Sequence, residues 1–161
     1  MRSALLVIDV QQAITKQKSD HIRNTLHHIN QIIQSFPIDQ VYYVRHIEEN
    51  TEFDESNEDS NLSDELLLVN DQIIKKYYNS AFLKTDLDEQ LRMKGIDNIY
   101  ICGFQTEYCI DATIKTGHFL GYHVHVYKDG HHTFDREIPA IKLKEHYDLQ
   151  FQIYAHVIDH I

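Results

Sequence analysis

The chain has 161 residues, of which 42% are hydrophobic, and its formal net charge at pH 7 is -10. This length suits one domain with a sizeable core, so we expect residues 1–161 to form a single domain. The acidic balance argues against binding to nucleic acid or to an anionic membrane surface. Two cysteines without a secretory segment or a membrane-length apolar run are typical of a cytoplasmic protein.

The first predicted strand, residues 4–10, has the sequence ALLVIDV and ends beside a carboxylate. A continuous apolar run of this kind is typical of a strand that is buried on both faces of a parallel sheet. Asp9 then lies near the carboxyl end of the strand, and Gln11 follows as the chain leaves the sheet. A carboxylate near the core is costly unless it is paired, so Asp9 either anchors the loop or acts as a general base.

Strands and helices alternate along the rest of the chain. Apolar residues recur every three or four positions in the helical segments, and Pro37 and Gly95 mark two of the helix ends. Residues 48–64 are acidic and poor in apolar side chains, so we interpret them as a loop that either covers a site or is simply solvated. The predicted helices cover residues 20–36, 86–94, a stretch after residue 106, and 135–152 with Pro139 in the first turn. The predicted strands cover residues 41–44, 71–78, 99–102, 123–127 and 154–158. A polar loop is predicted at residues 128–133.

This alternation predicts an α/β fold of three layers, with a parallel sheet between two layers of helices. Ligands of such folds bind outside the carboxyl ends of the strands, at the point where the strand order reverses. Asp9 and Cys109 both follow carboxyl ends of predicted strands. If strands one and four are neighbours, these two side chains share one crevice, and Lys75 or Lys76 of strand three, roughly 10 Å away, completes it.

Cys109 lies in the first turn of a helix that directly follows a strand. The free N–H groups and the positive end of the helix dipole favour a thiolate there, and the same groups stabilise an oxyanion. Cys109 is therefore either a nucleophile or a buried structural cysteine. Cys102, in contrast, lies in the middle of a strand and is interpreted as a core residue.

Four stretches along the chain resemble the isochorismatase-like cysteine hydrolases, which include nicotinamidases, N-carbamoylsarcosine amidases and ureidoacrylate hydrolases. They are LLVIDVQ at residues 5–11, IIKKYYNSAFLKTDL at 73–87, GFQTEYCIDAT at 103–113 and KDGHHTFD at 128–135. The resemblance implies a Rossmann-like fold with a six-stranded parallel sheet of order 3-2-1-4-5-6. It also implies a homodimer or larger homo-oligomer that acts on a small-molecule substrate.

The resemblance assigns roles to particular residues. The family's lysine stands four positions before the serine of its S-A-F motif, which selects Lys76 over Lys75, and its aspartate and nucleophile match Asp9 and Cys109. Backbone N–H groups of Gln105 and Cys109 are implied to form the oxyanion hole, with a cis peptide between Phe104 and Gln105. Three further residues are expected to line the pocket without taking part in the chemistry: Gln11, His46 and Phe82.

Two departures from the family narrow the expected chemistry. The metal-binding members carry an Asp-x-His pair after strand two, but here Val44 stands two positions before His46, so we expect no catalytic metal and no other cofactor. The cysteine favours hydrolysis of a C–N bond, in an amide, carbamoyl or ureido compound, through a thioester acyl-enzyme. Two alternatives remain at this stage: a thiol redox sensor or scavenger at Cys109, and a non-catalytic binding protein on the same scaffold.

Overall fold

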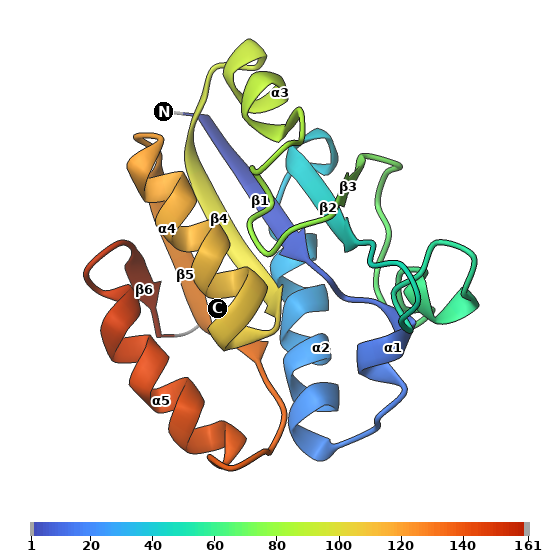
Figure 1. The fold of residues 1–161 in the computed structure, drawn as a ribbon. Helices are drawn as coiled ribbons and strands as arrows, with labels where there is room; N and C mark the ends of the chain where they lie inside the picture. Colours follow the sequence, from blue (N-terminus) through green and yellow to red (C-terminus); the bar gives the residue numbers. More distant parts are fainter. Residues whose placement is uncertain (1, 160–161) are drawn as a thin grey trace.

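A six-stranded sheet forms the centre of the molecule in a computed structural model that describes residues 2–159 (Figure 1). Its strands are ordered β3-β2-β1-β4-β5-β6, and each neighbouring pair is parallel. This confirms the predicted sheet and the predicted order 3-2-1-4-5-6. The strands are β1 (Arg2–Ile8), β2 (Val41–His46), β3 (Ile73–Lys76), β4 (Ile96–Phe104), β5 (His123–His132) and β6 (His156–Ile158).

Helices cover both faces of the sheet and complete the three layers (Figure 1). The long helix α2 packs on one face, while α3, α4 and α5 pack on the other. Within residues 2–159 no helix has the combination of length and apolar character that crossing a bilayer requires. The helices are α1 (Gln12–Thr15), α2 (Asp20–Gln34), α3 (Leu87–Met93), α4 (Asp111–Phe119) and α5 (Ala140–Phe151), with single turns at η1 (Ile38–Gln40), η2 (Glu58–Ser60) and the π-helical η3 (Thr106–Ile110).

Strand β1 shows why the sequence forms a buried central strand. Leu5 and Val7 belong to the apolar cluster on the α2 face, and Leu6 and Ile8 belong to the cluster on the opposite face. All four side chains are fully buried. Successive side chains of a strand point to opposite faces, so a strand with helices on both sides must be apolar at every position.

Strands β1 and β4 approach closely at their carboxyl ends because of Gly103. This residue has φ +126, and a Cβ added there would lie 2.0 Å from the backbone oxygen of Ile8. Only glycine adopts this conformation without strain and leaves room for the neighbouring backbone. The ends of β1 and β4 are thereby held side by side, and the chain continues from them to Asp9 and to Cys109.

Several predicted element boundaries were wrong, three of them as follows. Helix α5 begins at Ala140, after Pro139, instead of at residue 135, because the Asp135 carboxylate accepts the Ala140 N–H at 2.8 Å and so satisfies a helix-start donor. The polar segment 128–133 is not a loop: β5 continues to His132, where it pairs with Phe104 of β4. Strand β3 is shorter than the predicted 71–78, since its pairing with β2 ends at Lys76.

Candidate active site

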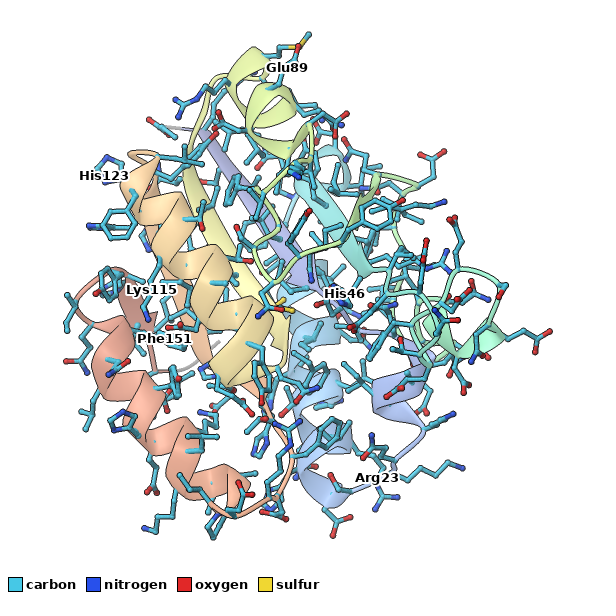
Figure 2. The ribbon with its side chains drawn as sticks, in the orientation of Figure 1. Arg23, His46, Glu89, Lys115, His123 and Phe151 are labelled. Carbon is cyan, nitrogen blue, oxygen red and sulfur yellow. The ribbon has the colours of Figure 1, made fainter. Side chains whose placement is uncertain are left out.

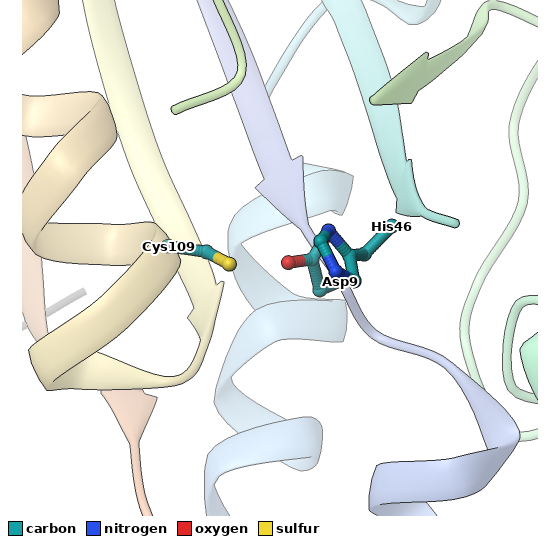
Figure 3. Close-up of side chains that lie close together, drawn as sticks. All are labelled: Asp9, His46 and Cys109. Atoms are coloured by element: carbon teal, nitrogen blue, oxygen red, sulfur yellow. The ribbon is translucent and has the colours of Figure 1, made fainter. Parts of the chain in front are cut away.

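Three predicted site residues meet at the carboxyl edge of the sheet. Asp9 follows β1, Lys76 ends β3, and Cys109 lies in the π-helical turn η3 after β4. Asp9, His46 and Cys109 each have one oxygen, nitrogen or sulfur atom within 4.8 Å of those of the other two. Figure 3 shows these side chains facing one another from three separate segments. Asp9 has φ 52, a left-handed conformation that a short polar residue tolerates and that turns the chain out of the sheet.

Lys76 holds the centre of this cluster. Its Nζ lies 2.9 Å from Asp9 Oδ2, 3.0 Å from His46 Nδ1 and 3.1 Å from Cys109 Sγ. The side chain is fully buried, so this ammonium has exchanged water for these three partners. Lys75, one position earlier in β3, points to the other side, where it is exposed and pairs with Glu55.

The site does not suit a metal ion. Asp9, His46 and Cys109 supply a carboxylate, an imidazole and a thiol, which are ordinary ligands for a divalent cation. The Lys76 ammonium, however, lies about 3 Å from all three donor groups, at the position that a cation would take. A metal there would be repelled by Lys76 unless that side chain lost its proton or moved away.

The electrostatics of the site favour a protonated resting sulfur. Burial raises the pKa of the Cys109 thiol, and the Asp9 carboxylate raises it further, against the opposite effect of Lys76. Burial by itself lowers the pKa of the Lys76 ammonium, but Asp9 and Cys109 more than offset this, so that pKa is raised. Burial and the charge of Asp9 thus oppose the thiolate that the helix start was expected to favour.

The Asp9 carboxylate is placed to take up a proton. Its Oδ2 pairs with Lys76, whereas its Oδ1 is buried and has no hydrogen-bond partner among the described residues. A buried acceptor without a partner is rare and calls for an explanation, of which a chemical role is one. Oδ1 is thus available to accept the proton of the Cys109 thiol.

A cavity of about 230 Å³ opens onto the sulfur. Of the pocket candidates, His46 lines it, but Gln11 and Phe82 do not. The Gln11 amide is buried and bonds the backbone of His46 in both directions, at 2.9 Å each, so it ties β1 to β2. Phe82 stacks on Tyr122 in the core. The cavity is lined by Asp9, Ile14, His46, Glu48, Phe53, Asn79, Gln105, Tyr108 and Cys109.

The peptide bond between Phe104 and Gln105 is cis, at the position that the motif indicated. The next residue, Thr106, is held from behind by a buried network, in which its Oγ1 bonds His131 Nδ1 at 2.9 Å. His131 Nε2 in turn bonds Asp148 Oδ1 at 2.9 Å, and Lys144 donates to the same carboxylate at 3.0 Å. Strand β5 and helix α5 therefore fix the segment that carries the Gln105 N–H.

Comparison with known proteins places this architecture. Residues 3–160 match the model of the isochorismatase domain. The chain belongs to the isochorismatase family. It is 29% identical over 155 residues to the uncharacterized isochorismatase family protein YddQ of Bacillus subtilis (strain 168), with 80% of this chain and 77% of that protein covered. A crystal structure of an isochorismatase family protein superposes with a TM-score of 0.86 at 26% identity, covering 98% of each chain.

Amidase-type enzymes are among the relatives of this isochorismatase-family hydrolase. The ureidoacrylate amidohydrolase RutB of Acinetobacter baylyi (strain ATCC 33305 / BD413 / ADP1) is 40% identical over 52 residues, which are 32% of this chain and 21% of RutB. N-carbamoylsarcosine amidase from Thermoplasma acidophilum shares the fold, with a TM-score of 0.78 at 23% identity over 98% of this chain and 95% of that chain. The predicted family and fold are thus confirmed.

Several residues that line the cavity of this isochorismatase-family protein were not singled out from the sequence. One of them is Asn79, with its Oδ1 3.9 Å from the Cys109 sulfur. Glu48 and Phe53 come from the acidic segment 48–64, which forms one wall of the cavity. Asn79 follows the carboxyl end of β3, where ligands of such folds bind, whereas the loop residues had no periodic pattern to indicate their direction.

Proposed function

We propose that the protein is a metal-independent cysteine hydrolase that cleaves a C–N bond in a small amide, carbamoyl or ureido compound. One observation supports this most: a sulfur, a carboxylate with a free oxygen and an ammonium share a buried cluster that opens to a small cavity. The ureidoacrylate amidohydrolase RutB among the relatives is consistent with C–N bond hydrolysis.

In the proposed reaction, Asp9 accepts the thiol proton while Cys109 Sγ attacks the carbonyl carbon of the substrate. Backbone N–H groups of Gln105 and Cys109 stabilise the oxyanion. The intermediate collapses to a thioester as Asp9 returns the proton to the leaving nitrogen. Water, deprotonated by Asp9, then attacks the thioester, and the acid product leaves as the thiol is reformed.

The raised pKa of the Cys109 thiol shapes this sequence. Since the resting sulfur keeps its proton, the proton transfer to Asp9 is coupled to the attack on the carbonyl carbon. Lys76 keeps its positive charge throughout, because Asp9 and Cys109 raise its pKa despite burial. It stabilises whichever of the two neighbours is negative at each step.

The test is amide turnover with intermediate trapping. Wild-type protein is incubated with a panel of small amides, carbamoyl and ureido compounds, and ammonia or amine release is followed together with the intact mass. We expect turnover and a transient acyl adduct on Cys109, both lost in Cys109→Ala and reduced at least 10³-fold in Lys76→Met, on the order of the loss seen for other catalytic groups. Lys75→Met is the matched control on the same strand. An unchanged rate in Cys109→Ala would falsify the proposal.

A redox role with a Cys102–Cys109 disulfide is less well supported. Cys102 is fully buried in the cluster on the α2 face, whereas Cys109 belongs to the cluster on the opposite face. Both are free thiols, and a disulfide requires Cβ atoms about 4 Å apart that point toward each other. A binding protein without turnover is tested by the same amide panel, since it predicts retained ligand binding in Asp9→Asn with no product from the wild type.

We further propose that residues 1–161 act as a single domain, in the cytoplasm, as a homo-oligomer. The two free cysteines agree with a reducing compartment. Large exposed apolar side chains on α4, α5 and the segment after α5, among them Phe119, Leu149 and Ile153, are compatible with an interface between copies. Sedimentation equilibrium tests this, and a monomer at micromolar concentration would contradict the assembly.

A further inference from the structure

We infer that the cavity selects small amides that are neutral or positively charged and discriminates against those that carry a carboxylate. This inference rests on the proposed function, because it concerns the substrate of the same site. It follows from the size of the cavity and from the charges of the residues that line it.

The cavity is small and partly apolar. Its volume of about 230 Å³ lies below the 300–1,000 Å³ that is usual for ligand pockets. Ile14, Phe53 and Tyr108 supply apolar surface beside the sulfur. A substrate that fits therefore has few atoms, and any charge on it lies close to every charge on the wall.

Two carboxylates belong to the wall, and neither arginine nor lysine is among the described residues that line it. Glu48 Oε2 lies 3.6 Å from His46 Nε2, next to the reaction centre (Figure 2 locates His46). The negative charge of Asp9 is neutralised by Lys76 at 2.9 Å. The negative charge of Glu48 has no lysine or arginine partner among the residues that line the cavity. His46 is mainly neutral, because burial and the adjacent Lys76 lower its pKa.

The nearby cations are directed to other partners. Arg45 bonds Ser60, and Lys75 pairs with Glu55. Arg136 reaches Gln105 and Tyr108 from outside, but it is paired with Glu107 at 3.1 Å. None of these three residues lines the cavity.

A carboxylate on the substrate would consequently lose water without gaining a positive partner, and it would be repelled by Glu48. Ureidoacrylate, which appears in the name of the relative RutB, carries a carboxylate, so we expect this cavity to take a different class of amide. RutB matches only 32% of this chain. A neutral amide meets no such penalty, and an ammonium group would be attracted to Glu48. Charge on the wall thus selects among amides of equal size.

The experiment uses two alkylating reagents of matched shape, iodoacetamide and iodoacetate. Each forms a thioether with the sulfur of Cys109, expels iodide and releases the thiol proton to solvent. The second-order rates are measured at pH 8.5 by mass spectrometry of the Cys109 peptide, and their ratio is divided by the ratio for the urea-unfolded chain. We expect the folded protein to favour iodoacetamide by a further factor of about ten, from one unbalanced charge at short range.

The variant Glu48→Gln is expected to lower this preference at least threefold, and 0.5 M salt to lower it in the wild type. Glu89→Gln is the matched control, since Glu89 is exposed on α3, well away from His46 in Figure 2. A preference equal to that of the unfolded chain, or faster reaction with iodoacetate, overturns the inference, as does an unaltered preference in Glu48→Gln.

Failure of this inference is distinguishable from failure of the proposed function. Alkylation reports on the cavity whether or not an amide is turned over, so the predicted ratio with no hydrolysis refutes only the hydrolase. Hydrolysis of succinamate as fast as that of propionamide refutes only the charge selection. If neither reagent modifies Cys109 of the folded protein and no amide of the panel is hydrolysed, the sulfur does not react with small molecules in this cavity, and both proposals fail.

Discussion

Replacing Lys76 by methionine tests the central cluster most directly. The substitution keeps much of the side-chain volume but removes an ammonium that contacts Asp9, His46 and Cys109 at 2.9–3.1 Å. Asp9, which is only 3% exposed, would then hold a buried negative charge with no cationic partner and with both oxygens unsatisfied. Breaking a buried ion pair from one side costs about 3–5 kcal/mol of folding free energy.

The loss comes from the negative charge that Asp9 would keep without a cationic partner. The double variant Asp9→Asn, Lys76→Met removes both charges of this pair, and we expect it to recover at least half of the loss at pH 7.

The assay is urea unfolding followed by far-UV circular dichroism and tyrosine fluorescence, since the chain has ten tyrosines and no tryptophan. Lys75→Met provides the baseline, because an exposed pair such as Lys75 with Glu55 contributes about 0–1 kcal/mol. A Lys76→Met loss below about 1 kcal/mol at pH 7, or no recovery in the double variant, would refute the reasoning that Lys76 neutralises a buried carboxylate.

Three further predictions concern the framework of the site. Gly103→Ala places a Cβ 2.0 Å from the Ile8 oxygen, so it should prevent folding or lower the melting temperature severely. Gly121→Ala is the comparison: at φ +90 with open space around it, it should cost only about 1–2 kcal/mol in urea unfolding. His131→Leu leaves the Asp148 carboxylate without the donor now 2.9 Å away and should cost about 2–4 kcal/mol in the same assay; a loss below about 1 kcal/mol would count against the buried network. Burial lowers the pKa of His131, so the unfolded chain binds more protons below pH 6.5 and the wild type should lose stability from pH 7 to pH 5; calorimetric melting should show a shallower decline for His131→Leu, and equal slopes would contradict this assignment.

The meeting of Asp9 with Cys109 was predictable because it follows from general rules. The strands that precede them contain continuous apolar runs, at residues 4–8 and 99–102, which are typical of central parallel strands, and parallel strands end at one edge of the sheet. Physical reasoning alone left Lys75 and Lys76 as alternatives. Successive side chains of a strand point to opposite faces of the sheet, but the strand pattern does not say which of the two faces the site. The family motif chose Lys76, which is the buried one.

Other features of the site were beyond sequence reasoning for physical reasons. The protonation of Cys109 depends on how deeply the sulfur is buried and how near Asp9 lies, which a helix start does not specify. Glu48 and Phe53 come from a segment without repeating structure, so no periodicity indicated that they face the cavity. The start of α5 was missed because the Asp135 side chain bonds forward across Pro139 to Ala140.

The segment between β2 and β3 supplies part of the cavity wall without contributing a strand to the sheet that carries the reacting groups. Part of the proposed choice of substrate is consequently encoded in a stretch of polypeptide that carries none of Asp9, Lys76 and Cys109. Replacing residues 47–72 by another segment would therefore change one wall of the cavity while Asp9, Lys76 and Cys109 stay in place.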